Sequence, residues 1–141
     1  MDDGALLDFL GGGIGLDCKK CSGRHPYVQS DIRRLPFRKN HFKTVTALEV
    51  LEHITEVDGV LTEIRDIMRD DGVFIMSTPL NNLAWRIIWP VWERTAGRYW
   101  RETHLVEYDY DWWIDKLDEY FEIVEEKRVW DINLIVKLKK K

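Results

Sequence analysis

A helix pattern followed directly by an apolar strand pattern constrains the fold of this chain more than any other feature. Residues 56–69 place apolar side chains on one face of a helix, and residues 72–79, GVFIMSTP, continue as a mostly apolar run stopped by Pro79. Thr55 is the expected N-cap, with Asp58 bonding back as in a capping box, and Gly72 is expected to end the helix in the left-handed conformation. A strand without a polar face must be covered on both sides, so this pair predicts an α/β fold with a mostly parallel sheet.

The rest of the chain contains shorter patterns of the same kinds. Apolar runs predict strands over residues 5–9, 14–17, 27–29 and 42–50. A second amphipathic helix is expected over residues 109–120, with Asp109 or Asp111 near its start. Residues 121–130 and 132–139 predict two strands, and the short join between them favours an antiparallel closing hairpin. The length of 141 residues predicts a single domain over residues 1–141.

Composition and charge exclude several classes of protein. Hydrophobic residues make up 45% and charged residues 33% of the chain, which is typical of a soluble globular protein, and the net charge of −4 argues against a nucleic-acid binder. No run is long and apolar enough to span a bilayer, and Asp2 and Asp3 stand where a signal peptide carries positive charge, so a cytoplasmic location is expected. Cys18 and Cys21 form one C-x-x-C pair near His25, but a second pair is missing, so no metal site is expected.

The segment LLDFLGGGIGLDCKK, residues 6–20, raises a problem of chain length. It places two predicted strands with only residues 10–13 between them, whereas parallel neighbours need a crossover of about a dozen residues or more. Such a link reaches only about 17 Å when fully extended. The pattern therefore predicts that the helix between the first two strands is missing from these 141 residues. Three explanations stay open: the crossover exists but is absent from this sequence, the gene lacks it, or a second chain supplies it by swapping.

Four segments together resemble class I S-adenosylmethionine-dependent methyltransferases of the type 11 kind. They are SDIRRLPF at residues 30–37, HFKTVTALEVLEHI at 41–54, EIRDIMRDDGVFIMSTP at 63–79 and HLVEYDYDWWIDKLDEYFEIVE at 104–125. The resemblance implies a Rossmann-like methyltransferase fold, with a mostly parallel sheet and an antiparallel C-terminal hairpin. Two surface turns depart from the family pattern, because Lys43 replaces an aspartate and Asp70-Asp71-Gly72 replaces Pro-Gly-Gly.

The resemblance also implies S-adenosylmethionine as the cofactor. Asp17 would accept hydrogen bonds from the ribose hydroxyls, which suits a carboxylate because its oxygens accept without donating. Asp31 would face the adenine amino group, with Ile32 packed on the ring, and Asp8 would end the first strand. By spacing alone, Asp17 and Asp31 fit helix caps or solvated loop acids equally well. The implied cofactor-binding residues are Asp8, Gly11, Gly12, Gly13, Asp17, Asp31, Ile32, Ala47 and Leu48.

Residues 80–108 form a variable segment that the resemblance assigns to a substrate lid. Trp85 and Trp89 lie one helical turn apart in it, and together with Glu49 they are the expected substrate-facing residues. The same aromatic side chains also suit core packing, a second subunit in a homodimer, or contact of residues 85–101 with a membrane surface. His53 and His104 are the candidate catalytic bases, which are needed only where the acceptor must lose a proton.

The function favoured by these features is S-adenosylmethionine-dependent methyl transfer to a small-molecule or lipid-like acceptor. The alternative is a non-catalytic methyltransferase-like binding or regulatory protein with an incomplete cofactor site, which the short glycine segment motivates. A nicotinamide enzyme is less favoured, because Leu16 stands where the fingerprint G-x-G-x-x-G requires its third glycine.

Overall fold

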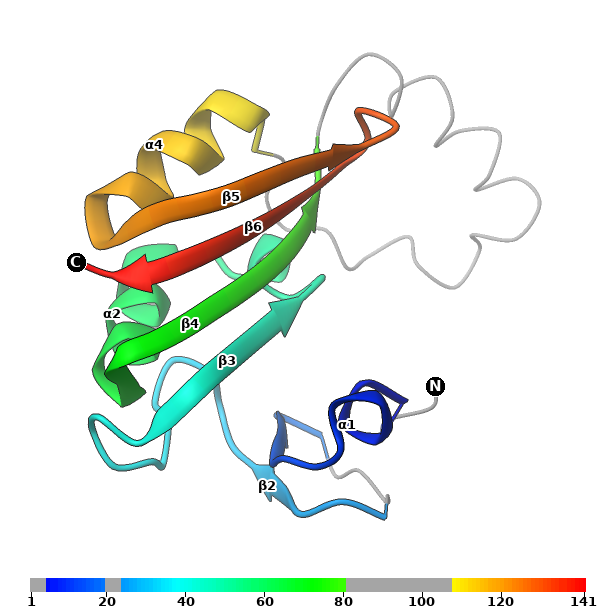
Figure 1. The fold of residues 1–141 in the computed structure, drawn as a ribbon, viewed down its shortest axis with the longest axis vertical. Coiled ribbons are helices and arrows are strands. Elements are labelled where there is room, and N and C mark those ends of the chain that lie inside the picture. Colours follow the sequence, from blue (N-terminus) through cyan, green and yellow to red (C-terminus); the bar gives the residue numbers. More distant parts are fainter. Residues whose placement is uncertain (1–4, 20–23, 81–107) are drawn as a thin grey trace.

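The strands of this protein form two separate sheets (Figure 1). The structure is a computed structural model that describes residues 5–19, 24–80 and 108–141, and the statements below concern these residues. The smaller sheet pairs β1 (Gly15–Asp17) with β2 (Tyr27–Gln29) in parallel. The larger sheet contains, in spatial order, β3 (Phe42–Leu48), β4 (Met68–Pro79), β6 (Asn133–Lys140) and β5 (Phe121–Val129).

The larger sheet combines one parallel pair with a closing antiparallel hairpin. β3 and β4 run parallel, with Val45 opposite Phe74, and β6 pairs antiparallel with both β4 and β5. The hairpin prediction is confirmed. Its turn places Trp130 and Asp131 at φ values of 51° and 58°, and the amide of Ile132 donates to the carbonyl of Val129 at 3.1 Å. These dihedrals are those of a type I′ turn, whose twist matches that of the strands it joins.

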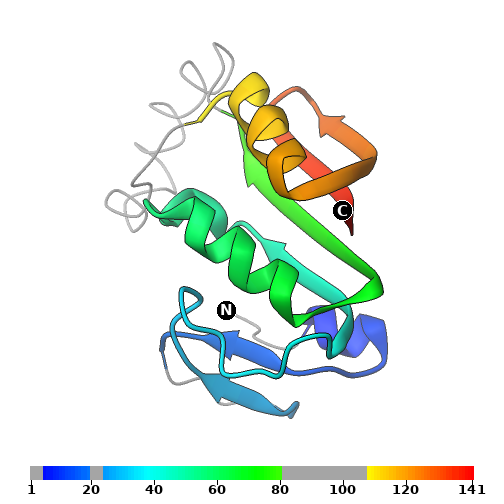
Figure 2. The ribbon, with the colours of Figure 1, turned by 90° about the vertical axis from the view of Figure 1, so that its left-hand side faces the viewer.

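Helices α2 (Val57–Ile67) and α4 (Tyr110–Tyr120) cover the same face of the larger sheet, as Figure 2 shows. Residues of β6 alternate between buried and exposed along the strand, so that only one face enters the core. This corrects the expectation that the sheet would be covered on both faces, because Ile135, Lys137 and Lys139 of the opposite face are exposed. The α2 and α4 helices are tied together by Asp58, which accepts from Lys116 Nζ at 3.0 Å and from Tyr120 Oη at 2.7 Å.

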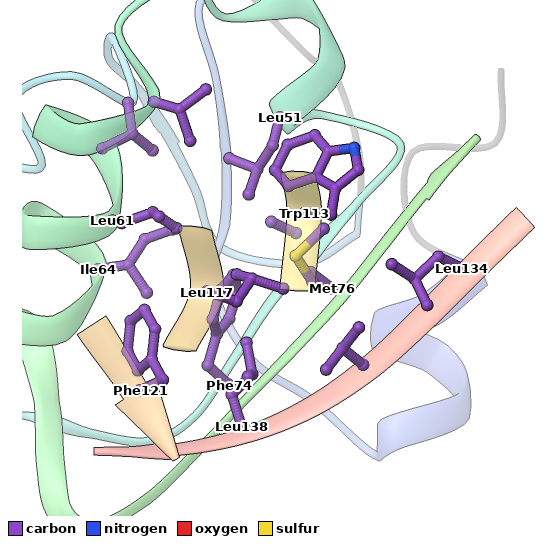
Figure 3. Packing of buried hydrophobic residues seen from close by; sticks show 14 of the residues in the cluster. Leu51, Leu61, Ile64, Phe74, Met76, Trp113, Leu117, Phe121, Leu134 and Leu138 are labelled. Atoms are coloured by element: carbon purple, nitrogen blue, oxygen red, sulfur yellow. The ribbon is translucent and has the colours of Figure 1, made fainter. Parts of the chain in front are cut away.

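The residues at the centre of the core come from every element of the larger sheet and from both helices (Figure 3). Phe74 of β4 is fully buried, and its ring centroid lies 5.5 Å from that of Phe121. Trp113 and Leu117 of α4 pack on the same cluster, as does Leu51 of the short 3-10 helix η1 (Leu51–His53). Hydrophobic burial of this cluster therefore holds α2 and α4 onto the sheet.

The first predicted strand is wrong, because residues 5–10 form the helix α1 (Ala5–Leu10). The amide of Gly12 donates to the carbonyl of Leu7 at 2.9 Å, the amide of Gly11 donates to that of Asp8 at 3.3 Å, and Gly11 has a φ of 76°. These are the bonds of a Schellman motif, which ends a helix at a left-handed glycine. The glycine run thus joins a helix to β1, a connection for which four residues suffice. The crossover expected between two strands is not needed here.

Two predicted helix ends are also wrong. Glu56, not Thr55, occupies the N-cap of α2, and its side chain makes no capping bond. Gly72 lies within β4, because the chain passes from α2 directly into the strand at Met68. A Cβ atom at Gly72 would meet the carbonyl oxygens of Arg69 at 2.8 Å and Phe42 at 3.1 Å, so close backbone approach requires this glycine.

The second helix begins as predicted. Asp109 is the N-cap of α4 and accepts a hydrogen bond from the amide of Trp112 at 2.9 Å. None of the helices in the described part of the chain is long and apolar enough to cross a membrane.

Candidate functional site

An apolar cavity of about 460 Å³, named here the inter-sheet cavity, lies between the two sheets. Its wall includes Leu7 of α1, Leu16 of β1, Ile32 after β2, Val45 of β3 and Ile64 of α2. Among the described residues, no ionisable side chain lines it, and threonines are the only polar side chains in its wall. A pocket of this size and polarity suits a small ligand with a substantial apolar part.

The structure brings some of the predicted cofactor residues to this cavity and leaves others outside it. Gly12, Gly13, Ile32 and Ala47 line the cavity. The residues outside its lining are Asp8, Gly11, Asp17, Asp31, Leu48 and Glu49. Of the remaining predicted site residues, His53 is described, whereas His104, Trp85, Trp89 and the whole of residues 85–101 lie outside the described residues.

Asp17 ends β1, next to Leu16 of the cavity wall. Its side chain is exposed, and Oδ1 accepts a hydrogen bond from the amide of Lys19 at 2.9 Å. The position at the carboxyl end of a parallel strand agrees with the prediction from the sequence. Open α/β sheets bind their ligands at this edge.

Asp31, which follows β2, is bound to its own neighbour. Arg33 donates to both carboxylate oxygens, at 3.0 Å from Nε to Oδ1 and 2.6 Å from Nη2 to Oδ2, and the Arg33 amide donates to Oδ1 at 2.9 Å. These hydrogen bonds lower the pKa of Asp31 to about 2. Asp31 is therefore a charged loop acid in an ion pair, one of the two alternatives open from its spacing, while Ile32 beside it turns into the cavity.

Asp8 does not end a strand. It lies in α1, and its carboxylate contacts Nη2 of Arg24 at 3.1 Å and Nε2 of His25 at 2.8 Å. This ion pair ties α1 to the segment that precedes β2. The glycines that follow Asp8 have two roles in the structure: the amides of Gly11 and Gly12 end α1, and Gly12 and Gly13 line the cavity.

Glu49 joins the carboxyl ends of β3 and β4 to the start of β6. Its Oε1 accepts from Ser77 Oγ at 2.7 Å and from Asn133 Nδ2 at 3.0 Å, and its amide donates to the Ser77 carbonyl at 3.0 Å. Glu49 adopts a φ of 54°, which is uncommon for a residue other than glycine. Such a conformation is held by its surroundings, and residues of this kind cluster at functional sites.

Glu52 is a candidate that the sequence interpretation missed. Its residue exposure is 3%, and Oε2 has no hydrogen-bond partner among the described residues. Burial raises the pKa of Glu52 to about 7, and the negative charge of Glu49 acts in the same direction. His53 Nε2 lies 3.9 Å from Glu52 Oε1. The sequence signal that could have identified Glu52 is the pair of acids in EVLEHI, Glu49 and Glu52, which follows the strand β3. An acid among apolar residues that enter the core needs a specific environment, because burial of a charge is costly.

Metal binding has no support from the described residues. Within them, no three His, Cys, Asp or Glu side chains gather as a metal ion would require. The predicted lack of a metal site stays a prediction.

Comparison with protein families identifies a match over residues 15–76. These residues match the model of a methyltransferase domain. Over 62 residues the chain is 34% identical to the sterol 24-C-methyltransferase ERG6B of Gibberella zeae, a match that covers 44% of this chain. The matched segment spans only 16% of the length of that enzyme.

Solved structures share the fold at low sequence identity. The PH0226 protein from Pyrococcus horikoshii OT3 superposes with a TM-score of 0.77 at 16% identity, over 96% of this chain and 76% of that one. The 1,6-didemethyltoxoflavin-N1-methyltransferase from Burkholderia thailandensis, solved with S-adenosylhomocysteine, has a TM-score of 0.68 at 15% identity, over 91% of this chain and 60% of that one. At such identities the likeness shows the fold alone, and the fold is the Rossmann-like methyltransferase fold expected from the sequence.

Proposed function

We propose that the protein transfers a methyl group from S-adenosylmethionine to a small-molecule or lipid-like acceptor, a proposal supported by the match of residues 15–76 to the model of a methyltransferase domain. The observation that carries this proposal is that Asp17 ends β1 and Ile32 lies in the loop after the neighbouring parallel strand β2, both beside an apolar cavity. The match to a sterol methyltransferase supports the lipid-like class of acceptor.

The chain's residues fit the nucleoside part of this cofactor. The exposed Asp17 carboxylate would accept hydrogen bonds from the ribose hydroxyls, Ile32 would pack on the adenine ring, and Ala47 would bring the backbone of β3 close to it. Asp31 would reach the adenine amino group only by giving up part of its ion pair with Arg33. When bound, the cofactor supplies an electrophilic methyl group on a sulfonium.

The residues at the carboxyl ends of β3 and β4 would bind and orient the acceptor. Alignment of the acceptor with the methyl group supplies much of the acceleration of such a displacement. The strained Glu49 is held rigidly by Ser77 and Asn133, so it can position a polar group of the acceptor. His53, next to the buried Glu52, would take up a proton where the acceptor has one to lose. The same base role for His104, and substrate contacts of Trp85 and Trp89, remain part of the proposal.

The second candidate function is a binding protein without catalysis. It is favoured by the glycine run, whose Gly11 and Gly12 amides are used to end α1 and so are not available to bind a ligand. A catalytic protein would bind S-adenosylhomocysteine more tightly than adenosine, because the amino-acid part would add contacts. Equal affinity for the two, without transfer of radiolabelled methyl to a lipid extract, would favour the binding protein.

The replacement Asp17→Ala should weaken binding of S-adenosylhomocysteine by about tenfold or more, equivalent to about 1.4 kcal/mol. The expected cause is the loss of the only carboxylate that ends β1 beside the cavity. Isothermal titration measures the change. The matched control is Asp71→Ala, an exposed aspartate near the beginning of β4 that does not line the cavity. If the Asp17 variant binds S-adenosylhomocysteine as tightly as wild type does, the proposed site is contradicted. If folded wild-type protein gives no binding heat when it is titrated with S-adenosylhomocysteine, the proposed function is contradicted.

A further inference from the structure

A carboxylate is held in a fixed position where β3 ends. Glu49 follows β3, and its Oε1 accepts hydrogen bonds from Ser77 Oγ of β4 at 2.7 Å and from Asn133 Nδ2 of β6 at 3.0 Å. The ends of β3 and β4 and the start of β6 lie toward the same end of the larger sheet in Figure 1. Ala47 and Val50, on either side of Glu49 in the sequence, line the inter-sheet cavity. A group bound to Glu49 would therefore lie beside the proposed cofactor site.

Only one oxygen of this carboxylate is bound by the described residues. Both hydrogen bonds to the Glu49 side chain end on Oε1, and none of the described residues donates to Oε2. Two donors from two strands, together with the backbone φ of 54°, fix the direction of the side chain. A carboxylate accepts hydrogen bonds without donating, so a ligand group that binds Oε2 must carry an N–H or an O–H. Such a donor would replace the water that an exposed carboxylate binds in the free protein.

The negative charge of Glu49 has no counter-ion among the described residues. Its two donors are a hydroxyl and a carboxamide, and both are neutral. Other loop acids differ in this respect, because Asp31 pairs with Arg33 at 2.6 Å and Asp131 pairs with Arg128 at 3.2 Å. A hydrogen bond between charged groups is roughly twice as strong as one between neutral groups. A positively charged donor would therefore bind Glu49 better than a neutral one.

The buried Glu52 strengthens this preference for a positive charge. Its residue exposure is 3%, and its Oε2 has no hydrogen-bond partner among the described residues. The charge of Glu49 opposes ionisation of Glu52 and so contributes to its raised pKa, which shows that the two carboxyl groups interact. His53 Nε2 lies 3.9 Å from Glu52 and forms no printed contact with Glu49. A cation bound at Glu49 would offset the repulsion between the two acids.

We propose that the acceptor carries a protonated amino group, which donates to Oε2 of Glu49, and that Ser77 and Asn133 are positioning residues for this contact. The inference rests on the proposed function, because it names the chemical class of the acceptor. The amino group serves recognition: it binds and orients the acceptor beside the cofactor. A hydroxyl in its place would keep the hydrogen bond and lose the attraction between charges, and a carboxylate would be repelled.

The test compares hexylammonium, hexan-1-ol and hexanoate, which share one apolar chain, on the whole chain of 141 residues. Titrations followed by the NMR signals of the backbone amides of residues 49, 77 and 133 give the three dissociation constants. Hexylammonium should bind about tenfold or more tightly than hexan-1-ol, and hexanoate should bind most weakly. Equal affinities for hexylammonium and hexan-1-ol, or no binding of hexylammonium, would overturn the inference.

Protein variants show whether the preference comes from Glu49. Glu49→Gln removes the charge and should abolish the preference for hexylammonium over hexan-1-ol. The matched control is Glu122→Gln at the far end of the hairpin, opposite Lys139, which should keep the full preference. Asn133→Ala removes one of the two bonds that hold Oε1 and should reduce the preference by about threefold. A full preference in the Glu49 variant would overturn the site, and a full preference in the Asn133 variant would overturn the positioning role.

Separate titration with S-adenosylhomocysteine distinguishes failure of this inference from failure of the proposed function. If S-adenosylhomocysteine binds and hexylammonium shows no preference, the amino-group inference is overturned and the proposed function stands. If hexylammonium is preferred through Glu49 and S-adenosylhomocysteine does not bind, the cation site is supported and the proposed function is contradicted.

Discussion

Replacement of Phe74 by alanine should lower the free energy of unfolding by about 3–5 kcal/mol. Phe74 is fully buried on β4, facing Phe121 and Leu117 across the core, as Figure 3 shows. The strands and the two helices around it come from distant parts of the chain. They cannot close on the space left by the ring without breaking other contacts, so a cavity remains and adds to the lost burial.

Urea denaturation followed by circular dichroism measures this effect. Phe9→Ala is the matched control, because Phe9 is 87% exposed and its removal should change stability by less than about 0.5 kcal/mol. A similar loss in the two variants would show that Phe74 is not in the cooperative core. A slope of the denaturation curve equal to that of wild type would confirm that only stability has changed.

The replacement Glu52→Gln should stabilise the protein at pH 8 by about 2–3 kcal/mol. The pKa of Glu52 is raised from 4.5 to about 7 by burial, so the folded protein holds a proton that the unfolded chain releases earlier. Between these two values the unfolded state binds fewer protons, and the stability of the wild type therefore falls as pH rises. This decrease in the unfolding free energy of the wild type is complete once the pH is above the folded-state pKa of about 7. Glutamine stays neutral at every pH and does not incur it.

The difference in unfolding free energy between wild type and this variant should thus grow from pH 4.5 to pH 7 and then level off. Comparing the two proteins at each pH removes the contributions of the ionisable groups that do not interact with residue 52. Glu122→Gln on the exposed side of β5 serves as the control and should show no such growth. A difference that shrinks with rising pH would contradict the assignment of a raised pKa to Glu52.

The buried carboxyl group of Glu52 lowers the unfolding free energy, and its place beside His53 fits a role in the proposed chemistry. Buried acids with raised pKa values near His side chains are typical of sites that bind or move protons. Glu52 adjoins His53 and stands three residues after the strained Glu49, which acts on its pKa. If Glu52→Gln stabilises the protein but lowers methyl transfer, then the wild-type Glu52 lowers stability and supports activity.

Long periodic segments were predicted correctly from the sequence. The patterns over residues 56–69 and 109–120 each span three turns or so, and both form helices within a residue or two of the predicted bounds. The strands β3, β4, β5 and β6 were also predicted, although β4 begins at Met68, four residues before the predicted start at Gly72. The site residues Ile32 and Ala47 followed from the resemblance of their segments, and both line the cavity.

Among the short segments, the strands β1 and β2 were predicted within a residue, but the first helix was not. A run of five or six apolar residues fits a strand and a helical turn equally, and only the bonds of Gly11 and Gly12 to the preceding turn show that residues 5–10 form a helix. Because residues 5–10 form a helix and not a strand, no crossover between two parallel strands is required before β1. A helix and the strand that follows it can be joined by a few residues. Gly72 is required by the backbone that approaches it, which a local pattern does not reveal.

The sequence by itself therefore determined the order of the main elements and the apolar face of each helix, because periodicity and motif spacing are local properties of the chain. Only the tertiary structure decided where the two sheets lie, which strand edges stay unpaired and which acid is buried. These depend on contacts between residues far apart in sequence. The separation of β1 from β3, and the burial of Glu52 but not Glu49, arise from such contacts.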